Sequence, residues 1–226
     1  MEAAWLPACM IVKQSQLALN DAADWLGDWH PLAEQLGSTD GLVNLSSVSS
    51  LLRLRPIQNV SSFRLFLKHY QHKVLFCIEL PAIESAHGHA TRNELRELID
   101  RDARLARESL LEQFAVASRR VGQYQLQKLR PLRDQRLVQR YLAAVEAGQA
   151  HGWHTLVYGV TLAVYSLPLR QGLLGYAHQT TRGFIYSASR VLRMSERTCR
   201  RLLDELTADL PQAVESLLGK KTPAEC

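Results

Sequence analysis

The balance between leucine and alanine on one side and isoleucine and valine on the other constrains this fold most. The 226 residues include 38 Leu and 24 Ala, against 6 Ile and 14 Val. Leu and Ala lose little freedom in a helix, whereas β-branched side chains favour strands. Because 46% of the residues are apolar, the chain can bury a substantial core. The composition therefore predicts an all-α protein, and the length suits one domain or two small ones.

Apolar residues recur at intervals of three and four, which predicts helices from about residue 61 onward. Ser61 or Ser62 is expected to cap the first helix, and Pro81 to kink or restart it. Thr91-Arg92-Asn93-Glu94 has the form of a capping box. A strand over 155–165 remains an alternative, because that run is rich in Val, Tyr and Thr. Further helices are expected at 95–126 in two parts meeting near 107, at 137–145, 154–167 and 168–192, and from about 195 to 210, with a short last stretch at 214–218.

These helices suit a single-domain bundle of about eight to ten helices. We expect a less regular N-terminal segment over residues 1–56, an all-helical core over 57–218 and a polar tail over 219–226. No internal repeat or linker of domain-boundary quality interrupts the pattern.

The chain lacks the marks of export, membrane insertion or a zinc site. Its first residues, Met1 to Trp5, are acidic where a signal peptide would be basic. The apolar run 156–167 is about a dozen residues long, which suits a core helix rather than a membrane span. Cys9, Cys77, Cys199 and Cys226 form no CxxC pair. We therefore expect a cytoplasmic protein that does not contact membranes.

No sequence pattern indicates catalysis. There is no phosphate-binding GxxxxGK[ST], no GxGxxG and no GxSxG. Pairs of histidines invite a metal hypothesis, but none has a third ligand at motif spacing, so solvated or core-edge histidines are the favoured interpretation. The acidic pairs are interpreted as ordinary solvated helix faces. The histidine pairs are His69 and His72, and His151 and His154, each expected at i, i+3 on one helix, and His87 and His89 near a helix end. The acidic pairs are Glu94 and Glu97, and Asp100 and Asp102. We predict no enzyme, no cofactor and no bound metal.

Two features point to protein partners. Five arginines would form one stripe if their segment were a continuous helix, either as a surface for an acidic partner or as a solvated face. Small residues recur in the apolar helix after Pro168, and their cost in helix propensity suggests close helix contact, in the core or across a dimer. The arginines are Arg190, Arg193, Arg197, Arg200 and Arg201, and the small residues include Gly172, Gly175, Ala177 and Gly183.

Several segments, taken in order, resemble the urease accessory protein UreF family. The stretch from His154 to Tyr176, with Ser187-Ala188-Ser189-Arg190-Val191-Leu192, is similar to the family's C-terminal half. Glu79-Leu80-Pro81 resembles its Asp/Glu-Leu-Pro, and Ser118-Arg119-Arg120-Val121-Gly122 its Ser-Arg-x-Met-Gly. The resemblance covers about Ile57 to Leu210. Two family motifs differ: the N-terminal one survives as Gly37-Ser38 and Gly41-Leu42, and Pro-Leu-Gly-Gln is replaced by Arg193-Met194-Ser195-Glu196.

The resemblance implies an all-α, non-catalytic scaffold, commonly homodimeric. Such a scaffold sits between UreD (also called UreH) and the GTPase UreG and promotes nickel insertion into the urease apoprotein. The candidate partner or dimer contacts are Glu79, Pro81, Ser118, Gly122, Gly172, Gly175, Tyr176, Gly183, Arg190, Arg193, Arg197 and Arg200. Three alternatives remain: a divergent all-α adaptor serving another assembly, a basic helical nucleic-acid-binding module, which the modest charge of +5 disfavours, and, weakest, a metal-dependent enzyme.

Overall fold

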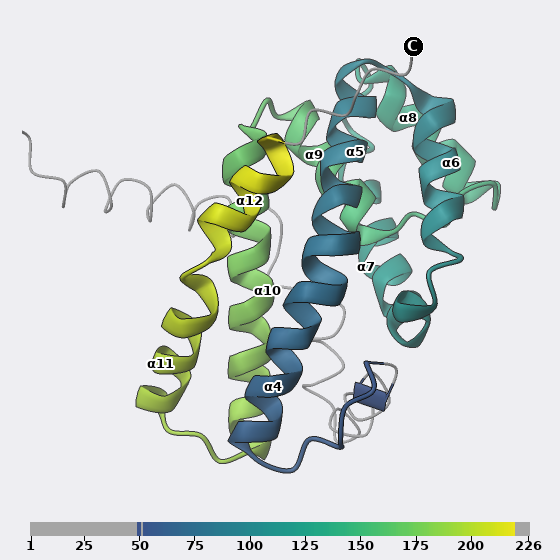
Figure 1. The fold of residues 1–226 in the computed structure, drawn as a ribbon. Helices are drawn as coiled ribbons and strands as arrows, with labels where there is room; N and C mark the ends of the chain where they lie inside the picture. Colours follow the sequence, from purple (N-terminus) through teal and green to yellow (C-terminus); the bar gives the residue numbers. More distant parts are fainter. Residues whose placement is uncertain (1–48, 51, 220–226) are drawn as a thin grey trace, which may run out of the picture.

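A computed structural model describes residues 49–50 and 52–219, and every regular element in this part is helical (Figure 1). The all-α prediction is confirmed. The strand considered for 155–165 is wrong, because helix α9 (His154–Val164) occupies that run. Every residue from His154 to Leu162 is buried, so the apolar, β-branched composition reflects a helix enclosed on all sides. The expected N-terminal segment (1–56) and polar tail (219–226) lie almost entirely outside the described residues.

A long helical rod begins the described fold and changes its hydrogen-bond pattern midway (Figure 1). It consists of α4 (Val60–Tyr70), a π-helical segment η1 (Gln71–Glu79) and α5 (Leu80–Thr91). Asn59, rather than Ser61 or Ser62, caps α4, and Ser62 completes a reciprocal capping box with it. Pro81 restarts the α-helical pattern without ending the rod, because the wide π turns directly before it absorb the loss of its N–H group.

The capping box predicted at Thr91–Glu94 is wrong. Thr91 is the last residue of α5, and its hydroxyl donates to the His87 carbonyl at 2.9 Å. Asn93 adopts a positive φ of 59°, and Glu94 turns its carboxylate back toward His89 and Arg92. The sequence has the right residue types, but the preceding helix extends further than the pattern indicates and uses Thr91 itself.

The remaining helices follow the predicted order. After α6 (Leu95–Leu105), a 3₁₀ helix η2 (Ser109–Phe114) leads into α7 (Ala115–Lys128), which confirms the division near residue 107. Helix α8 (Arg136–Glu146) ends before Gly148, which adopts a positive φ of 72°. Three helices follow α9: α10 (Leu169–Val191), α11 (Glu196–Thr207) and α12 (Leu210–Gly219).

Helix α9 is the centre of the packing and lies against α5 and α7, while α10 packs on α5, α11 and α12 (Figure 1). A Cβ atom at Gly159 of α9 would lie 2.4 Å from the Ile83 carbonyl oxygen of α5, so glycine allows these two backbones to approach. An aromatic cluster joins the rod to α10: the rings of Tyr70 and Phe184 meet edge to face at 4.9 Å. The fold thereby brings residues from 70 to 184 around one interior.

Candidate functional site

Five polar side chains from five helical elements form one buried series of hydrogen bonds, called here the buried polar chain. The Tyr70 hydroxyl donates to Glu79 Oε1 at 2.8 Å, and Tyr176 also hydrogen bonds to Glu79. The Tyr176 hydroxyl lies 2.7 Å from His154 Nε2, and Ser118 Oγ lies 2.8 Å from His154 Nδ1. Each of the five residues is at most 5% exposed. The buried polar chain links α4, η1, α7, α9 and α10 through the interior.

Both tyrosines in this chain remain neutral hydrogen-bond donors at physiological pH. Burial raises the pKa of Tyr70 and of Tyr176 well above the ordinary value, and the nearby Glu79 raises both pKa values further. Since the single Tyr176 proton goes to the Glu79 carboxylate, the Tyr176 oxygen accepts from His154 Nε2–H. In that tautomer the His154 ring accepts the Ser118 hydroxyl proton at Nδ1. Every proton in the series thus has an assigned acceptor.

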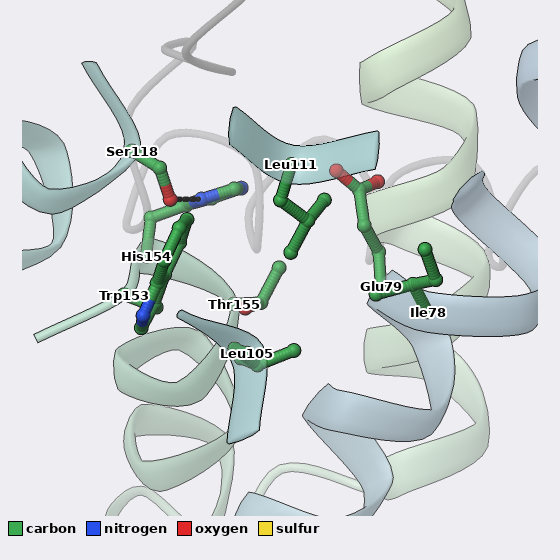
Figure 2. Close-up of a pocket in the computed structure, with 8 residues that line it drawn as sticks. All are labelled: Ile78, Glu79, Leu105, Leu111, Ser118, Trp153, His154 and Thr155. Atoms are coloured by element: carbon green, nitrogen blue, oxygen red, sulfur yellow. Dashed lines mark hydrogen bonds between the residues drawn. The ribbon is translucent and has the colours of Figure 1, made fainter. Parts of the chain in front are cut away.

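Figure 2 shows a hollow next to the buried polar chain. Glu79, Ser118 and His154 line this hollow together with neighbouring side chains such as Leu105 and Leu111. The space between the lining residues is too narrow to admit a water molecule. Ser118 and His154 have the contact that a nucleophile and its base require. Because Ser118 is 1% exposed and the hollow admits no water, the pair meets no substrate in this structure. Its contacts serve to hold three helices in register.

A glycine one helical turn from Ser118 allows α7 to meet the start of α9. A Cβ atom at Gly122 would lie 2.1 Å from the Gly152 carbonyl oxygen and 2.6 Å from the His154 backbone nitrogen. Both neighbours are backbone atoms, which have no rotamer with which to move aside. Gly122 therefore sets the separation at which Ser118 reaches His154.

A second buried polar group, called here the Asp102 clamp, ties α6 to α8 and to the loop before α9. Asp102 is fully buried, and its carboxylate accepts the Tyr141 hydroxyl at 2.7 Å. It also accepts the backbone N–H groups of His151, at 2.7 Å, and Gly152, at 2.9 Å, and lies 2.8 Å from His151 Nδ1. Interpreting Asp102 as part of a solvated face was wrong. Its spacing from Leu98 and Leu105 places it on the apolar side of α6, which is the signal that could have identified it.

His151 and His154 have different hydrogen-bond partners and do not form a metal site together. His151 lies in the loop against Asp102, whereas His154 begins α9 and has both ring nitrogens engaged in the buried polar chain. The expectation that this pair lies on one helix is therefore wrong. His69 contacts the Leu65 carbonyl oxygen, and His72 packs on the Phe76 ring. Among the residues that the structure describes, no group of three or more His, Cys, Asp or Glu side chains is placed to hold a metal ion.

The structure places the other predicted site residues on α10 and around its C-terminal end. Gly172 packs on the Leu162 side chain of α9, Gly175 is buried and Gly183 is half-buried. The five arginines do not form one continuous stripe, because α10 ends at Val191 and α11 begins at Glu196, close to the boundaries predicted at 192 and 195. Arg193 lies in the turn between them with a positive φ of 50°, while Arg190, Arg197 and Arg200 are exposed on the two helices.

Sequence reasoning selected Glu79, Ser118 and Tyr176 as separate motif residues. In the structure His154 joins Ser118 to Tyr176, and Tyr176 bonds directly to Glu79. Sequence reasoning missed the role of His154, which it had assigned to a histidine pair. The signal was the position of this histidine at the start of a helix without charged residues, where a polar ring needs buried partners.

Comparison with known protein families gives one match to the described core. No helix among residues 52–219 is long and apolar enough to span a membrane. A search of curated proteins found no match. The family model described as UreF matches residues 57–207, the region that holds both the buried polar chain and the Asp102 clamp. From the all-helical fold, the shared motif residues and this match, which spans most of the chain, we conclude that the protein belongs to the UreF family of urease accessory proteins.

Proposed function

We propose that this chain is a non-catalytic scaffold of urease maturation, which bridges UreD (UreH) and the GTPase UreG and promotes nickel insertion into the urease apoprotein. The observation that carries the proposal is the family match over residues 57–207. In this proposal the GTP chemistry belongs to UreG, and this chain contributes shape and surface. The narrowness of the hollow beside Ser118 and His154 supports a structural role for the buried polar chain.

The exposed arginines at the end of α10 and on α11 are our candidates for one partner contact. Within the described part of the chain, Arg190, Arg193 and Arg197 form no ion pair, whereas Arg200 pairs with Glu196. Exposed guanidinium groups without an ion pair favour an acidic partner surface. We further propose that the protein is cytoplasmic and forms a homodimer, with the half-buried Gly183 of α10 allowing close contact.

The test is reconstitution with the cognate UreD and UreG. Full-length protein is mixed with each partner, with and without GTP, and complexes are measured by size-exclusion chromatography with light scattering. We expect a complex with UreD and a larger assembly after UreG is added. Arg197→Glu should weaken the assembly, whereas Arg55→Glu, which makes the same charge change at another exposed site, should not. Absence of a complex with both partners under every nucleotide condition would refute the proposal.

A second candidate is a divergent adaptor that serves another assembly. The observation in its favour is the turn Arg193-Met194-Ser195-Glu196, which stands where the family has Pro-Leu-Gly-Gln and starts α11 with Ser195 as its cap. Homodimer formation without any binding to UreD would support this candidate over the first.

A further inference from the structure

Helix α7, labelled in Figure 1, carries two large and exposed side chains. Val116 is 78% exposed and Tyr124 is 61% exposed. Residues 116, 120 and 124 follow one another at intervals of four, which places them on the same side of the helix. Exposed aliphatic and aromatic side chains that share a helix face are typical of protein–protein contacts rather than of a solvated surface.

The surroundings of these side chains are strongly basic. Residues 119–140 contain seven Arg or Lys residues and one Asp, and α7 itself contains no acidic residue. Lys128 Nζ lies 4.5 Å from the centroid of the Tyr124 ring. Within the described residues, Arg133, Arg136 and Arg140 form no ion pair, while Arg130 pairs with Glu146. The exposed Val116 and Tyr124 thus share α7 with the Lys128 cation and with no acidic residue, and the chain that follows this helix carries further exposed arginines without an ion pair in the described part of the protein.

The opposite side of α7 holds this surface rigid. Gly122 packs directly on the backbone at the start of α9, and the Gln123 side-chain amide donates to the His151 carbonyl at 2.9 Å. The Arg119 guanidinium lies 5.6 Å from the centroid of the Trp153 ring and also bonds to the Ala115 carbonyl. A surface fixed before binding loses little conformational entropy when a partner docks.

We propose that this α7 strip, defined by Val116, Tyr124 and Lys128, is a docking surface for an acidic protein face with an apolar recess for the Tyr124 ring. The inference rests on the proposed function, because the partner is taken to be a member of that maturation assembly. It adds a second surface to the arginines at the end of α10, and a bridging scaffold needs two. A second copy of the chain fits poorly here, since like charges would meet.

Binding of the full-length chain to immobilised cognate UreD and UreG tests the proposal. Tyr124→Ala should weaken binding to one partner about 30-fold, as for a central aromatic contact, whereas Tyr124→Phe, which keeps the ring, should bind like the wild type. Lys128→Glu should weaken binding to the same partner about tenfold at low salt and less at physiological salt. Arg55→Glu, the matched charge change elsewhere, should have no effect. Because Tyr124 and Lys128 are exposed, circular dichroism should show unchanged folding for every variant.

Several outcomes would overturn the inference. Wild-type affinity of Tyr124→Ala for both partners refutes the α7 surface and leaves the proposed function standing, whereas a wild-type chain that binds neither partner refutes both. Tyr124→Ala could instead keep partner binding and lose binding to a short DNA duplex, or lose homodimer formation. Either result would assign the strip to another occupant and refute the proposal. Residues 1–48 contain six acidic residues and one lysine. A synthetic peptide of that segment that displaces the partner from the wild type, but not from Tyr124→Ala, would make the chain itself the occupant and also refute the proposal.

Discussion

The Asp102 clamp gives the sharpest test of how this fold is held together, through the substitution Asp102→Asn. Asparagine has nearly the same size and shape, so the packing of α6 is preserved. Asp102 Oδ1 accepts the His151 N–H and Oδ2 accepts the Gly152 N–H. The NH₂ group of asparagine must replace one of these oxygens, and in either orientation it faces a backbone N–H that cannot reverse its role. The hydroxyl of Tyr141 and the ring of His151, by contrast, can rearrange.

The cost follows from this mismatch. One buried backbone N–H without an acceptor costs about 1 to 3 kcal/mol, and the remaining hydrogen bonds lose the strength that the charged carboxylate gives them. We expect the free energy of unfolding to fall by about 3 kcal/mol. For a chain of this size, that change lowers the melting temperature by about 6 to 12 °C.

The assay is urea denaturation and thermal unfolding of the full-length protein, followed by circular dichroism. Asp100→Asn is the matched control, because Asp100 is exposed on the same helix and its change should alter stability by about 0.5 kcal/mol or less. If the two variants unfold within about 1 kcal/mol of each other, the clamp contributes little and our account of α6 is wrong.

Three further predictions concern separate parts of the fold. Gly122→Ala places a Cβ atom against backbone and should lower the free energy of unfolding by about 3 kcal/mol in denaturant titrations; wild-type stability would contradict the contact with α9. Arg193→Val puts a β-branched residue at positive φ and should cost about 1 kcal/mol by the same measurement, whereas Arg193→Gly should not destabilise. The hydrogen bond from Arg92, then that from His89, lowers the pKa of Glu94 to about 2 from an ordinary 4.5. A carboxyl group whose pKa is lower in the folded than in the unfolded chain stabilises the fold at pH values above its unfolded pKa. The stability advantage of the wild type over Glu94→Gln should therefore be full above pH 4.5 and vanish as the pH falls to about 2. An advantage that is independent of pH would contradict this assignment.

Helix content and helix order could be predicted because they depend on local pattern. The Leu and Ala excess, the apolar spacing, and the stops at Gly148 and Pro168 each act within a few residues. Boundaries were less secure where two local signals compete. Thr91 had both the side chain of a cap and a position within reach of the His87 carbonyl, and the longer helix prevailed.

The interior of the candidate site could be predicted only in part. Motif order selected Glu79, Ser118 and Tyr176. Nothing in their spacing shows that the His154 imidazole joins Ser118 to Tyr176, or that Tyr176 bonds to Glu79, because these residues meet only after the helices pack. The arginine spacing left open whether one stripe forms, because a stripe required one continuous helix. The turn at 192–195 separates these residues onto two helices.

The narrowness of the hollow beside His154 has a consequence for the local opening of this protein. With no water inside, the hydroxyl protons of Ser118 and Tyr176 exchange with solvent only when α7, α9 and α10 part from one another. Slowly exchanging hydroxyl resonances would therefore report the opening of this helical junction directly. A partner that binds the scaffold should slow the exchange of these hydroxyl protons further without contacting Ser118 or Tyr176.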